Sequence, residues 1–201
     1  MSDFDDLIAR IKSCTLCSLS EKRTQVVPGE GSPEAEIMFV GEGPGFYEDR
    51  DGRPFIGPAG KFLDELLDSI GLRRETVYIT NMVKCRPPNN RDPLPGEVSA
   101  CRPYLDSQIE MISPKIIVTL GRHSFTKFFP SQTLTKARGQ SQQWSNLTIY
   151  PIYHPAAALH NPRLRSVILE DFRRLPDLVK AATQMPIEPA AVPTRQLSLF
   201  E

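Results

Sequence analysis

Three polar residues directly follow or end predicted β-strands and could together form one reactive site. Glu42 comes after the apolar run EIMFVG, Asn81 ends the run VYITN, and His154 ends the run LTIYPIYH. In open parallel α/β sheets, ligands bind outside the carboxyl ends of the strands. A carboxylate, an amide and an imidazole are therefore expected to meet in one pocket. Singly, each residue could serve a turn, a helix cap or a buried hydrogen bond, but the three together favour a functional site.

Four cysteines form a second group, with the spacing of metal ligands. Cys14 and Cys17 are separated by two residues, which lets both sulfurs face one metal, while Cys85 and Cys101 enclose a loop with four prolines. Four thiolates suit either a tetrahedral zinc ion or an iron–sulfur cluster. The wide second spacing favours the larger cluster, but spacing alone leaves both metals open, and four inert buried cysteines remain the alternative.

Length and composition indicate one α/β domain. The chain has 201 residues, of which 40% are hydrophobic, with 24 acidic and 24 basic side chains. This balance argues against a largely disordered chain, and no apolar run approaches the roughly 20 residues that span a bilayer. The acidic N-terminus lacks the apolar core of a signal peptide. We therefore expect a cytoplasmic protein without membrane contact, and a monomer.

Charge is distributed unevenly along the chain. Residues 1–75 carry a net charge of −6, whereas residues 121–175 carry +6. A basic half on a neutral protein is compatible with a surface that binds a polyanion. Ordinary solvated helices and loops would give the same count, so the asymmetry supports nucleic-acid binding without establishing it.

The elements that must position these residues alternate between strand and helix. Strands are predicted at 36–41, 77–81, 115–121 and 147–154, and helices at 3–13, 58–71, 97–112, 122–129 and 163–181. Pro151 predicts an edge position or a bulge for the fourth strand. The alternation predicts a three-layer α/β/α sandwich with a central four-stranded parallel sheet. We expect a folded domain over 1–181 and a flexible Pro-rich tail over 182–201.

Five motifs in this order resemble the family 4 uracil-DNA glycosylases, which are iron–sulfur enzymes. They are GEGPG (41–45), GRPFIGPAG (52–60), ITNMVKCRPPNNRDPLP (79–95), ACRPYL (100–105) and HPAAAL (154–159). The resemblance covers roughly residues 10–178. It implies a monofunctional enzyme that releases uracil from DNA, leaves an abasic site and so initiates base excision repair, and it adds the nucleoid to the expected location.

The resemblance also implies roles for individual residues. Glu42 matches the residue that positions water or supports the sugar cation, and His154 matches the histidine beside uracil O2. Asn81 matches the amide that reads the uracil edge, and Phe55 matches the aromatic ring that stacks on the base. Glu48 takes the place of a residue that crowds a thymine methyl group. The resemblance further implies that Gly41 and Gly43 bind the substrate. It also implies that a 4Fe-4S cluster is held by four ligands: Cys14, Cys17, Cys85 and Cys101.

DNA contacts are expected near the last motif. Leu159 is a candidate wedge for the space that a flipped base vacates, with an ordinary buried leucine as the alternative. Many relatives carry a basic residue where this chain has His160, so Arg163 or Arg165 is expected to contact phosphate instead. Related proteins that bond covalently to the abasic sugar carry a histidine in a basic insertion after the second strand. The segment NNRDPLPGE lacks that histidine, which favours turnover over trapping.

The end of the tail resembles the pentapeptide with which bacterial proteins dock on the DNA polymerase sliding clamp. Leu197, Leu199 and Phe200 would fill an apolar groove and Gln196 would make the polar contact. The resemblance implies a bacterial source and repair tethered to replication. A tail helix that packs on its own domain is the alternative.

Two other functions fit the same scaffold. A catalytically silent protein could bind or covalently capture damaged DNA, and multiple-turnover kinetics would separate it from an enzyme. An iron–sulfur electron carrier or redox sensor would need a cluster that is reducible at physiological potentials. That function leaves the predicted pocket at Glu42, Asn81 and His154 without a purpose.

Overall fold

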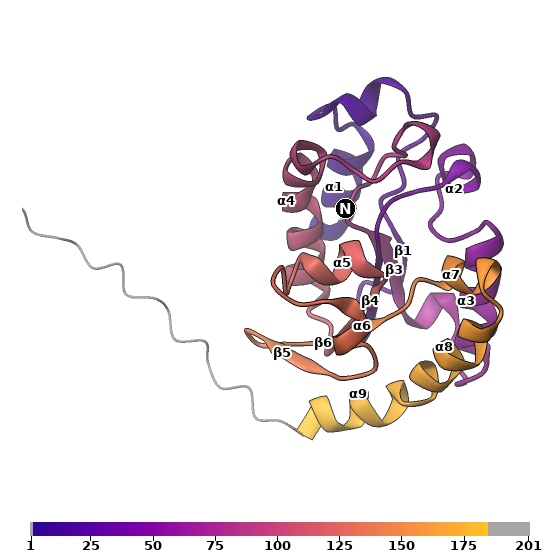
Figure 1. Ribbon diagram of the computed structural model, residues 1–201. Coiled ribbons are helices and arrows are strands. Elements are labelled where there is room, and N and C mark those ends of the chain that lie inside the picture. Colours follow the sequence, from indigo (N-terminus) through magenta and orange to yellow (C-terminus); the bar gives the residue numbers. More distant parts are fainter. Residues whose placement is uncertain (1, 185–201) are drawn as a thin grey trace, which may run out of the picture.

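A six-stranded sheet forms the centre of the computed structural model, which describes residues 2–184 (Figure 1). The strand order is β1-β3-β2-β4-β6-β5. The strands are β1 (Glu30–Gly31), β2 (Ile37–Gly41), β3 (Tyr78–Asn81), β4 (Ile116–Leu120), β5 (Gln142–Trp144) and β6 (Leu147–Ile152). The four inner strands pair in parallel, which confirms the predicted sheet. The short strands β1 and β5 add antiparallel edges that were not predicted.

Helices surround this sheet. The α-helices are α1 (Asp3–Lys12), α2 (Phe46–Asp51), α3 (Pro58–Asp68), α4 (Pro95–Ile112), α5 (Arg122–Thr126), α6 (Leu134–Ala137), α7 (Pro155–His160), α8 (Arg163–Arg173) and α9 (Leu175–Gln184). Short 3-10 turns lie at η1 (Ser18–Glu21), η2 (Arg74–Thr76) and η3 (Pro88–Asn90). No helix among the described residues has the length and apolar character needed to cross a membrane.

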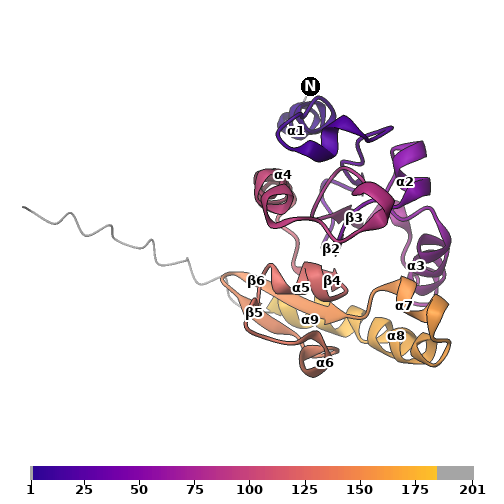
Figure 2. The same ribbon diagram turned by 45° about the horizontal axis from the view of Figure 1, so that its top comes forward.

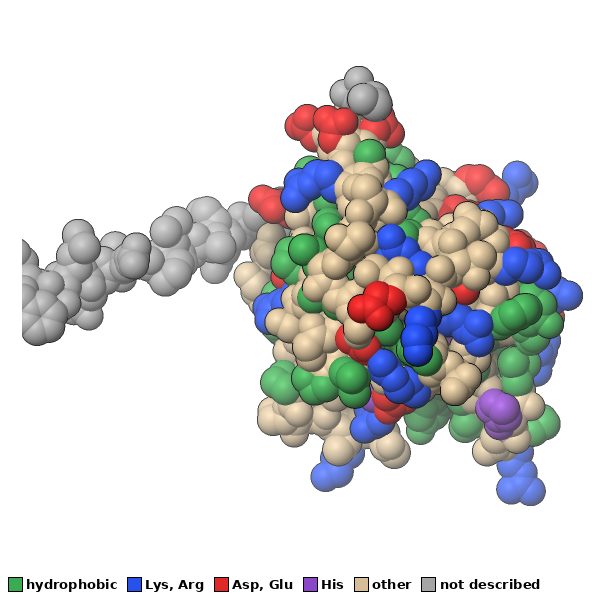
Figure 3. Space-filling model, turned by 90° about the horizontal axis from the view of Figure 1, so that it is seen from above, with side chains coloured by type: hydrophobic (Ala, Val, Ile, Leu, Met, Phe, Trp, Pro, Cys, Tyr) green, Lys and Arg blue, Asp and Glu red, His purple; other side chains and the backbone are tan. Residues whose placement is uncertain are grey.

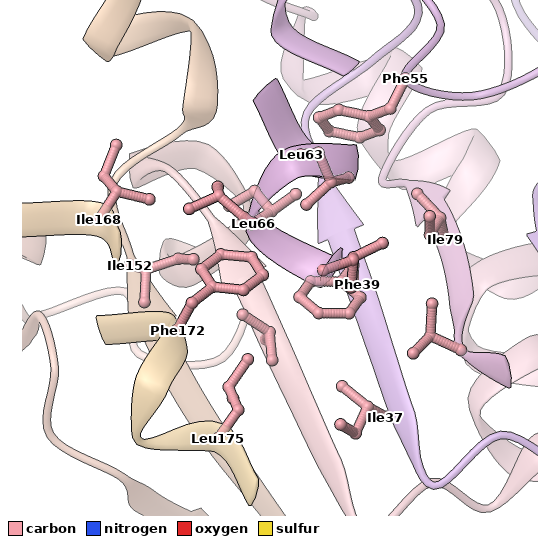
Figure 4. Packing of buried hydrophobic residues seen from close by; sticks show 14 of the residues in the cluster. Ile37, Phe39, Phe55, Leu63, Leu66, Ile79, Ile152, Ile168, Phe172 and Leu175 are labelled. Atoms are coloured by element: carbon pink, nitrogen blue, oxygen red, sulfur yellow. The ribbon is translucent and has the colours of Figure 1, made fainter. Parts of the chain in front are cut away.

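Both faces of the sheet are buried, because the inner strands carry apolar side chains on each face. On one face, Phe39 stacks on Phe172 of α8 with ring centroids 5.6 Å apart, within a cluster formed with α3 and α9. Figure 4 shows Phe55 at the end of this cluster, beyond Leu63. On the other face, Met38 and its neighbours pack against α4 and against Phe4 of α1, which contacts α4. The sheet and the two helical layers form the predicted α/β/α sandwich.

Pro151 does not place β6 at an edge of the sheet. The residue pairs with Thr119 of β4 on one side, and its carbonyl accepts a hydrogen bond from the N–H of Gly139 on the other. Strand β5 pairs only with the earlier part of β6, over 147–149. The proline nitrogen, which cannot donate, faces the side that β5 no longer covers. A local gap in pairing therefore replaces the expected edge or bulge.

The predicted helix over 163–181 is two helices, α8 and α9. Pro176 lacks an N–H and its ring crowds the preceding turn, so the helix breaks at Arg174. Helix α9 is described as far as Gln184, the last described residue, so the predicted boundary at residue 181 stays a prediction. The predicted clamp-binding residues Gln196–Phe200 lie outside the described residues.

Candidate active site and cysteine centre

The carboxyl ends of the parallel strands bring together the three polar residues predicted from the sequence. Gly41 at the end of β2 is the register partner of Asn81 at the end of β3. His154 follows β6, and a Cβ atom on Gly121, after β4, would lie 3.1 Å from its Cβ. Helices α2, α5 and α7 border this end of the sheet (Figure 2).

Gly41 leaves space for the two groups that would hold a planar base. A Cβ atom at this position would lie 2.4 Å from Oδ1 of Asn81 and 2.6 Å from Cζ of Phe55. Any side chain there would displace the amide or the ring. Gly43 is constrained in the same way by Val83, because its Cβ would lie 2.8 Å from Cγ2 of that residue. Both glycines thus allow close packing that a side chain would prevent, whereas their predicted contact with substrate stays a prediction.

Asn81 presents an unused hydrogen-bond acceptor. Its side chain is 1% exposed, and its Oδ1 atom has no hydrogen-bond partner. Buried polar atoms are nearly always paired in folded proteins, so an exception calls for an explanation. The Asn81 main chain, in contrast, is held firmly, since its carbonyl accepts a hydrogen bond from Nζ of Lys84 at 2.8 Å. A fixed residue with a free acceptor is suited to a ligand that donates.

Lys84 supports Asn81 through a buried network that sequence reasoning missed. The side chain is 2% exposed, and its Nζ also donates to Thr80 Oγ1 and to Gln108 Oε1, each at 2.6 Å. Burial lowers the pKa of Lys84 to about 7. Only the fold brings α4 close enough for Gln108 to complete the network, so no local pattern indicates it.

His154 is arranged as a neutral hydrogen-bond donor. Its Nδ1 atom accepts a hydrogen bond from the backbone N–H of Ala156 at 3.1 Å, at the first turn of α7. This contact assigns the proton of the neutral ring to Nε2. Burial lowers the pKa of His154 to about 4, against the opposing field of Glu48. The imidazole therefore stays uncharged at neutral pH with an N–H to offer.

Phe55 lies against His154 in a constrained backbone conformation. The two rings are stacked with centroids 5.5 Å apart and planes 28° apart. The φ angle of Phe55 is +51°, which is unusual for a bulky residue and marks stored strain. Arg74 holds this conformation by donating to the carbonyl of Phe55 at 3.0 Å and to Asp64 at 2.9 Å. Arg74 is a second residue that the sequence did not reveal.

Glu48 fastens α2 to the segment that carries Phe55. Its carboxylate accepts hydrogen bonds from the backbone N–H groups of Gly45, Ile56 and Gly57 at 2.9 to 3.1 Å. Three backbone donors thus fix both oxygens. The exclusion of thymine by Glu48 stays a prediction, while its structural role is evident from these contacts.

Glu42 lies beside a histidine that the sequence analysis passed over. Nε2 of His123 is 3.7 Å from Oε2 of Glu42 and 3.0 Å from Oδ2 of Asp92. Burial raises the pKa of Glu42, His123 lowers it and Asp92 raises it. The sequence did contain a signal for His123, because this residue follows the third predicted strand in the run KIIVTLGRH. Its partner Asp92 lies in the Pro-rich loop, which only the fold places nearby.

The predicted DNA-contacting residues differ in their surroundings. Leu159 on α7 is 48% exposed, which excludes the buried alternative. Arg163 and His160 are also exposed. Arg165 forms an ion pair with Glu65, and its guanidinium lies 4.4 Å from the ring centroid of Phe62. Arg165 is therefore already engaged within the protein, whereas Leu159 and Arg163 are available.

About half of the net positive charge of residues 121–175 is offset by acidic residues from elsewhere in the chain, namely Glu65, Asp92 and Asp106. Six of its eight basic residues form ion pairs: Arg122, Lys127, Arg138, Arg165, Arg173 and Arg174. The charge count alone therefore overstates the case for a basic face. Figure 3, a view from above, nevertheless shows lysine and arginine side chains gathered near the centre and along one side, with hydrophobic side chains among them.

The four cysteines converge from distant parts of the chain. Cys14 and Cys17 follow α1, Cys85 follows β3, and Cys101 lies in α4. They line one apolar pocket together with residues that include Ile11, Leu19, Val83 and Ala100. All four are free thiols. The structure thus joins two pairs that the sequence could place together only as a hypothesis.

The polar groups around the sulfurs suit thiolate ligands. Nη1 of Arg23 lies 3.2 Å from Sγ of Cys85, and the backbone N–H of Lys84 lies 3.3 Å from Sγ of Cys101. Burial raises the pKa of Cys101 to about 11, so an ionised sulfur there needs a metal to balance its charge.

Comparisons with known proteins find relatives that match most of the chain. Residues 28–173 match the model of the uracil DNA glycosylase superfamily. The chain is 52% identical to the type-4 uracil-DNA glycosylase of Sulfurisphaera tokodaii, over 89% of this chain and 86% of the relative. It is 47% identical to the type-4 enzymes of Archaeoglobus fulgidus, over 89% and 94%, and of Thermotoga maritima, over 85% and 92%. These sources include archaea and bacteria, so they do not decide between a bacterial and an archaeal origin.

Proposed function

The chain belongs to the uracil-DNA glycosylase superfamily and to its type-4 group, and from this premise we propose how its residues release uracil. As a uracil-DNA glycosylase, it hydrolyses the N-glycosidic bond of deoxyuridine in DNA. The products are free uracil and an abasic site, which opens base excision repair. The observation that carries the residue assignment is the buried, unpartnered Oδ1 of Asn81. The ring of Phe55 links it to His154, because this ring is stacked on the neutral imidazole and shares the space above Gly41 with the Asn81 amide.

Asn81 reads the edge of the base. Its Oδ1 accepts the N3–H of uracil, while its amide nitrogen donates to O4. Cytosine presents an unprotonated N3 and a donating amino group. Acceptor would then face acceptor at Oδ1, and donor would face donor at the amide nitrogen. A buried site that leaves polar groups unpaired rejects the wrong base strongly. The base must leave the DNA stack to reach this pocket, at a cost of a few kcal/mol.

His154 stabilises the departing base. Cleavage of the C1′–N1 bond leaves uracil with negative charge, part of it on O2. The Nε2–H of His154, fixed by the Ala156 contact, donates to this oxygen without moving. A preorganised donor of this kind accounts for about 3 to 4 kcal/mol of transition-state stabilisation. Phe55 covers the face of the base, because its ring is stacked beside the imidazole.

Glu42 serves the sugar side of the reaction. The deoxyribose develops oxocarbenium character as the base leaves, and a carboxylate offsets that charge. The same group can orient a water molecule and accept its proton. His123 lies 3.7 Å from Glu42 and favours the ionised carboxylate that both roles require. Asn81 and His154 thus contact the base, and Glu42 serves both the sugar and the attacking water. This set favours repeated hydrolysis over covalent capture of the abasic sugar.

The cysteine centre is proposed to hold a 4Fe-4S cluster with a structural role. Cys14, Cys17, Cys85 and Cys101 would be its ligands, and the support is four thiols around one apolar pocket with N–H donors to two sulfurs. A cluster bound there would supply cross-links between the N-terminal segment, the loop after β3 and α4. A redox function is less well supported, because an electron carrier would not require the site formed by Asn81 and its neighbours.

The remaining proposals concern partners and location. We propose that Gln196, Leu197, Leu199 and Phe200 dock on a bacterial-type sliding clamp, that the protein is monomeric, and that it works in the cytoplasm at the nucleoid. The support is the order of residues in QLSLF. Deleting 196–201 should abolish retention on an immobilised clamp and leave uracil release from short oligonucleotides unchanged.

Single-turnover release from matched oligonucleotides tests the residue assignment. The DNA carries uracil, cytosine or thymine at one position, and abasic sites are revealed by alkaline cleavage. We expect release of uracil alone, and a loss of about 10²- to 10³-fold in rate for Glu42→Gln and for His154→Gln. His160→Gln, at an exposed histidine, is the matched control. Equal release of cytosine, or an unchanged rate in both variants, would contradict the assignment.

A further inference from the structure

Two exposed aromatic rings lie on α2, directly after the turn that carries Glu42, and have no role in the chemistry above. Phe46 is 54% exposed and Tyr47 is 44% exposed, and both belong to α2, which begins directly after the GEGPG turn. Their rings meet edge to face with centroids 5.6 Å apart. Contiguous exposed apolar side chains rimmed by polar groups often mark interaction sites.

Arginine side chains flank both rings. The guanidinium of Arg86 lies 5.2 Å from the ring centroid of Phe46, and that of Arg50 lies 5.6 Å from the ring centroid of Tyr47. Arg86 is oriented by its Nε, which donates to Oδ1 of Asn90 at 2.7 Å. We call Phe46, Tyr47 and Arg86 the aromatic platform. Aromatic rings interleaved with cations match the bases and phosphates of a single nucleic-acid strand.

The platform is connected to the base pocket by rigid contacts. A Cβ atom on Gly57 would lie 3.1 Å from the Tyr47 ring, so Tyr47 packs on the segment that follows Phe55. Glu48 ties the same helix to that segment through the N–H groups of Ile56 and Gly57. Arg86, the third member of the platform, follows β3 in the sequence, and β3 ends with Asn81 of the base pocket. The platform and the pocket therefore keep a fixed relation to each other.

We propose that the aromatic platform binds the unpaired base next to the flipped uracil in the same strand, so that the enzyme prefers single-stranded DNA. This inference rests on the proposed function, because it assumes that the neighbouring pocket takes uracil. Phe46 stacks on the base and Arg86 contacts a phosphate beside it. A base that is paired in a duplex keeps its own stacking partners and gains less from Phe46.

The test compares affinity for single-stranded and duplex oligonucleotides that carry an uncleavable uracil nucleotide. Phe46→Ala is expected to weaken single-strand binding by about 10-fold or more and duplex binding by less than about 3-fold. Phe46→Trp should restore the affinity, whereas Phe46→Leu, which keeps apolar bulk without an aromatic face, should not. Met111→Ala is the matched control, because Met111 is 46% exposed near the end of α4, next to the amino end of β4.

Two further readouts separate stacking from other effects. The single-turnover rate at saturating DNA should stay within about 3-fold of the parent, since Phe46 touches neither reacting atom. Adding one nucleotide beside uracil should strengthen binding of the parent and not of Phe46→Ala. Equal affinity of parent and variant, equal losses on both forms of DNA, or full affinity in Phe46→Leu would overturn the platform. Absence of uracil release by the parent would instead overturn the proposed function, which these affinities do not measure.

Discussion

Gly41 and Asn81 are register partners at the ends of β2 and β3, and a Cβ atom on Gly41 would lie 2.4 Å from Oδ1 of Asn81. The backbone of one strand therefore sets the position of the amide on the other. Gly41→Ala should fold, because its neighbours Asn81 and Phe55 can move toward the pocket, but both pocket groups would then be misplaced. We expect uracil release to fall by about 100-fold, with an unchanged far-ultraviolet circular dichroism spectrum. An active Gly41→Ala enzyme would contradict this geometry.

Asn81→Ala should separate activity from stability. The Oδ1 atom has no partner in the protein, so its removal costs no hydrogen bond and relieves a buried unsatisfied acceptor. We expect uracil release to fall by at least about 100-fold while the melting temperature stays the same or rises. Thr80→Ala is the control, because Thr80 is equally buried but hydrogen-bonded to Pro28. A lower melting temperature in Asn81→Ala than in Thr80→Ala would argue for a structural role.

Protonation of His154 should make stability depend on pH in a defined direction. Burial lowers its pKa to about 4 from an ordinary value near 6.5, so between these values only the unfolded chain binds the proton. The free energy of unfolding should therefore decrease as pH falls from about 7 toward 4. Chemical denaturation of His154→Gln should show a weaker decrease over the same interval, and His160→Gln should follow the parent. Parallel curves for the parent and His154→Gln would refute the assignment.

The ionisation of Glu42 should respond in opposite directions to its two neighbours. His123 lowers the pKa of Glu42 and Asp92 raises it. Activity requires the carboxylate, so the acidic limb of kcat/KM should move to higher pH in His123→Ala and to lower pH in Asp92→Asn. The pH profiles of both variants on one single-stranded substrate provide the measurement. Shifts of the same sign would show that the pair acts on Glu42 in another way.

Loss of one cluster ligand should affect folding before chemistry. Cys85 lies between β3 and the Pro-rich loop, and its sulfur accepts a hydrogen bond from Arg23. Cys85→Ala should lower iron content and the melting temperature, because metal binding contributes directly to folding free energy. Leu16→Ala, an exposed neighbour of the ligands, is the control. Iron-free protein with normal stability would contradict a structural cluster.

The sequence predicted the parts of this protein that depend on local patterns. The inner strands are recognisable because Ile37–Gly41 and Ile116–Leu120 are apolar on both faces. Strands β1 and β5 are only two and three residues long and lack a comparable apolar run, so the sequence did not reveal them. Arg74 and His123 were missed for a different reason, since their partners Phe55, Glu42 and Asp92 come from other elements. Only the assembled sheet brings those groups within reach.

The most direct test of the account is multiple-turnover base release by anaerobically purified protein from an oligonucleotide with one uracil. Iron and sulfide are assayed on the same sample. The account predicts many molecules of free uracil for each protein molecule, abasic product, and about four irons per chain. One equivalent of bound or captured DNA without turnover, or intact uracil in the presence of a full complement of iron, would contradict it.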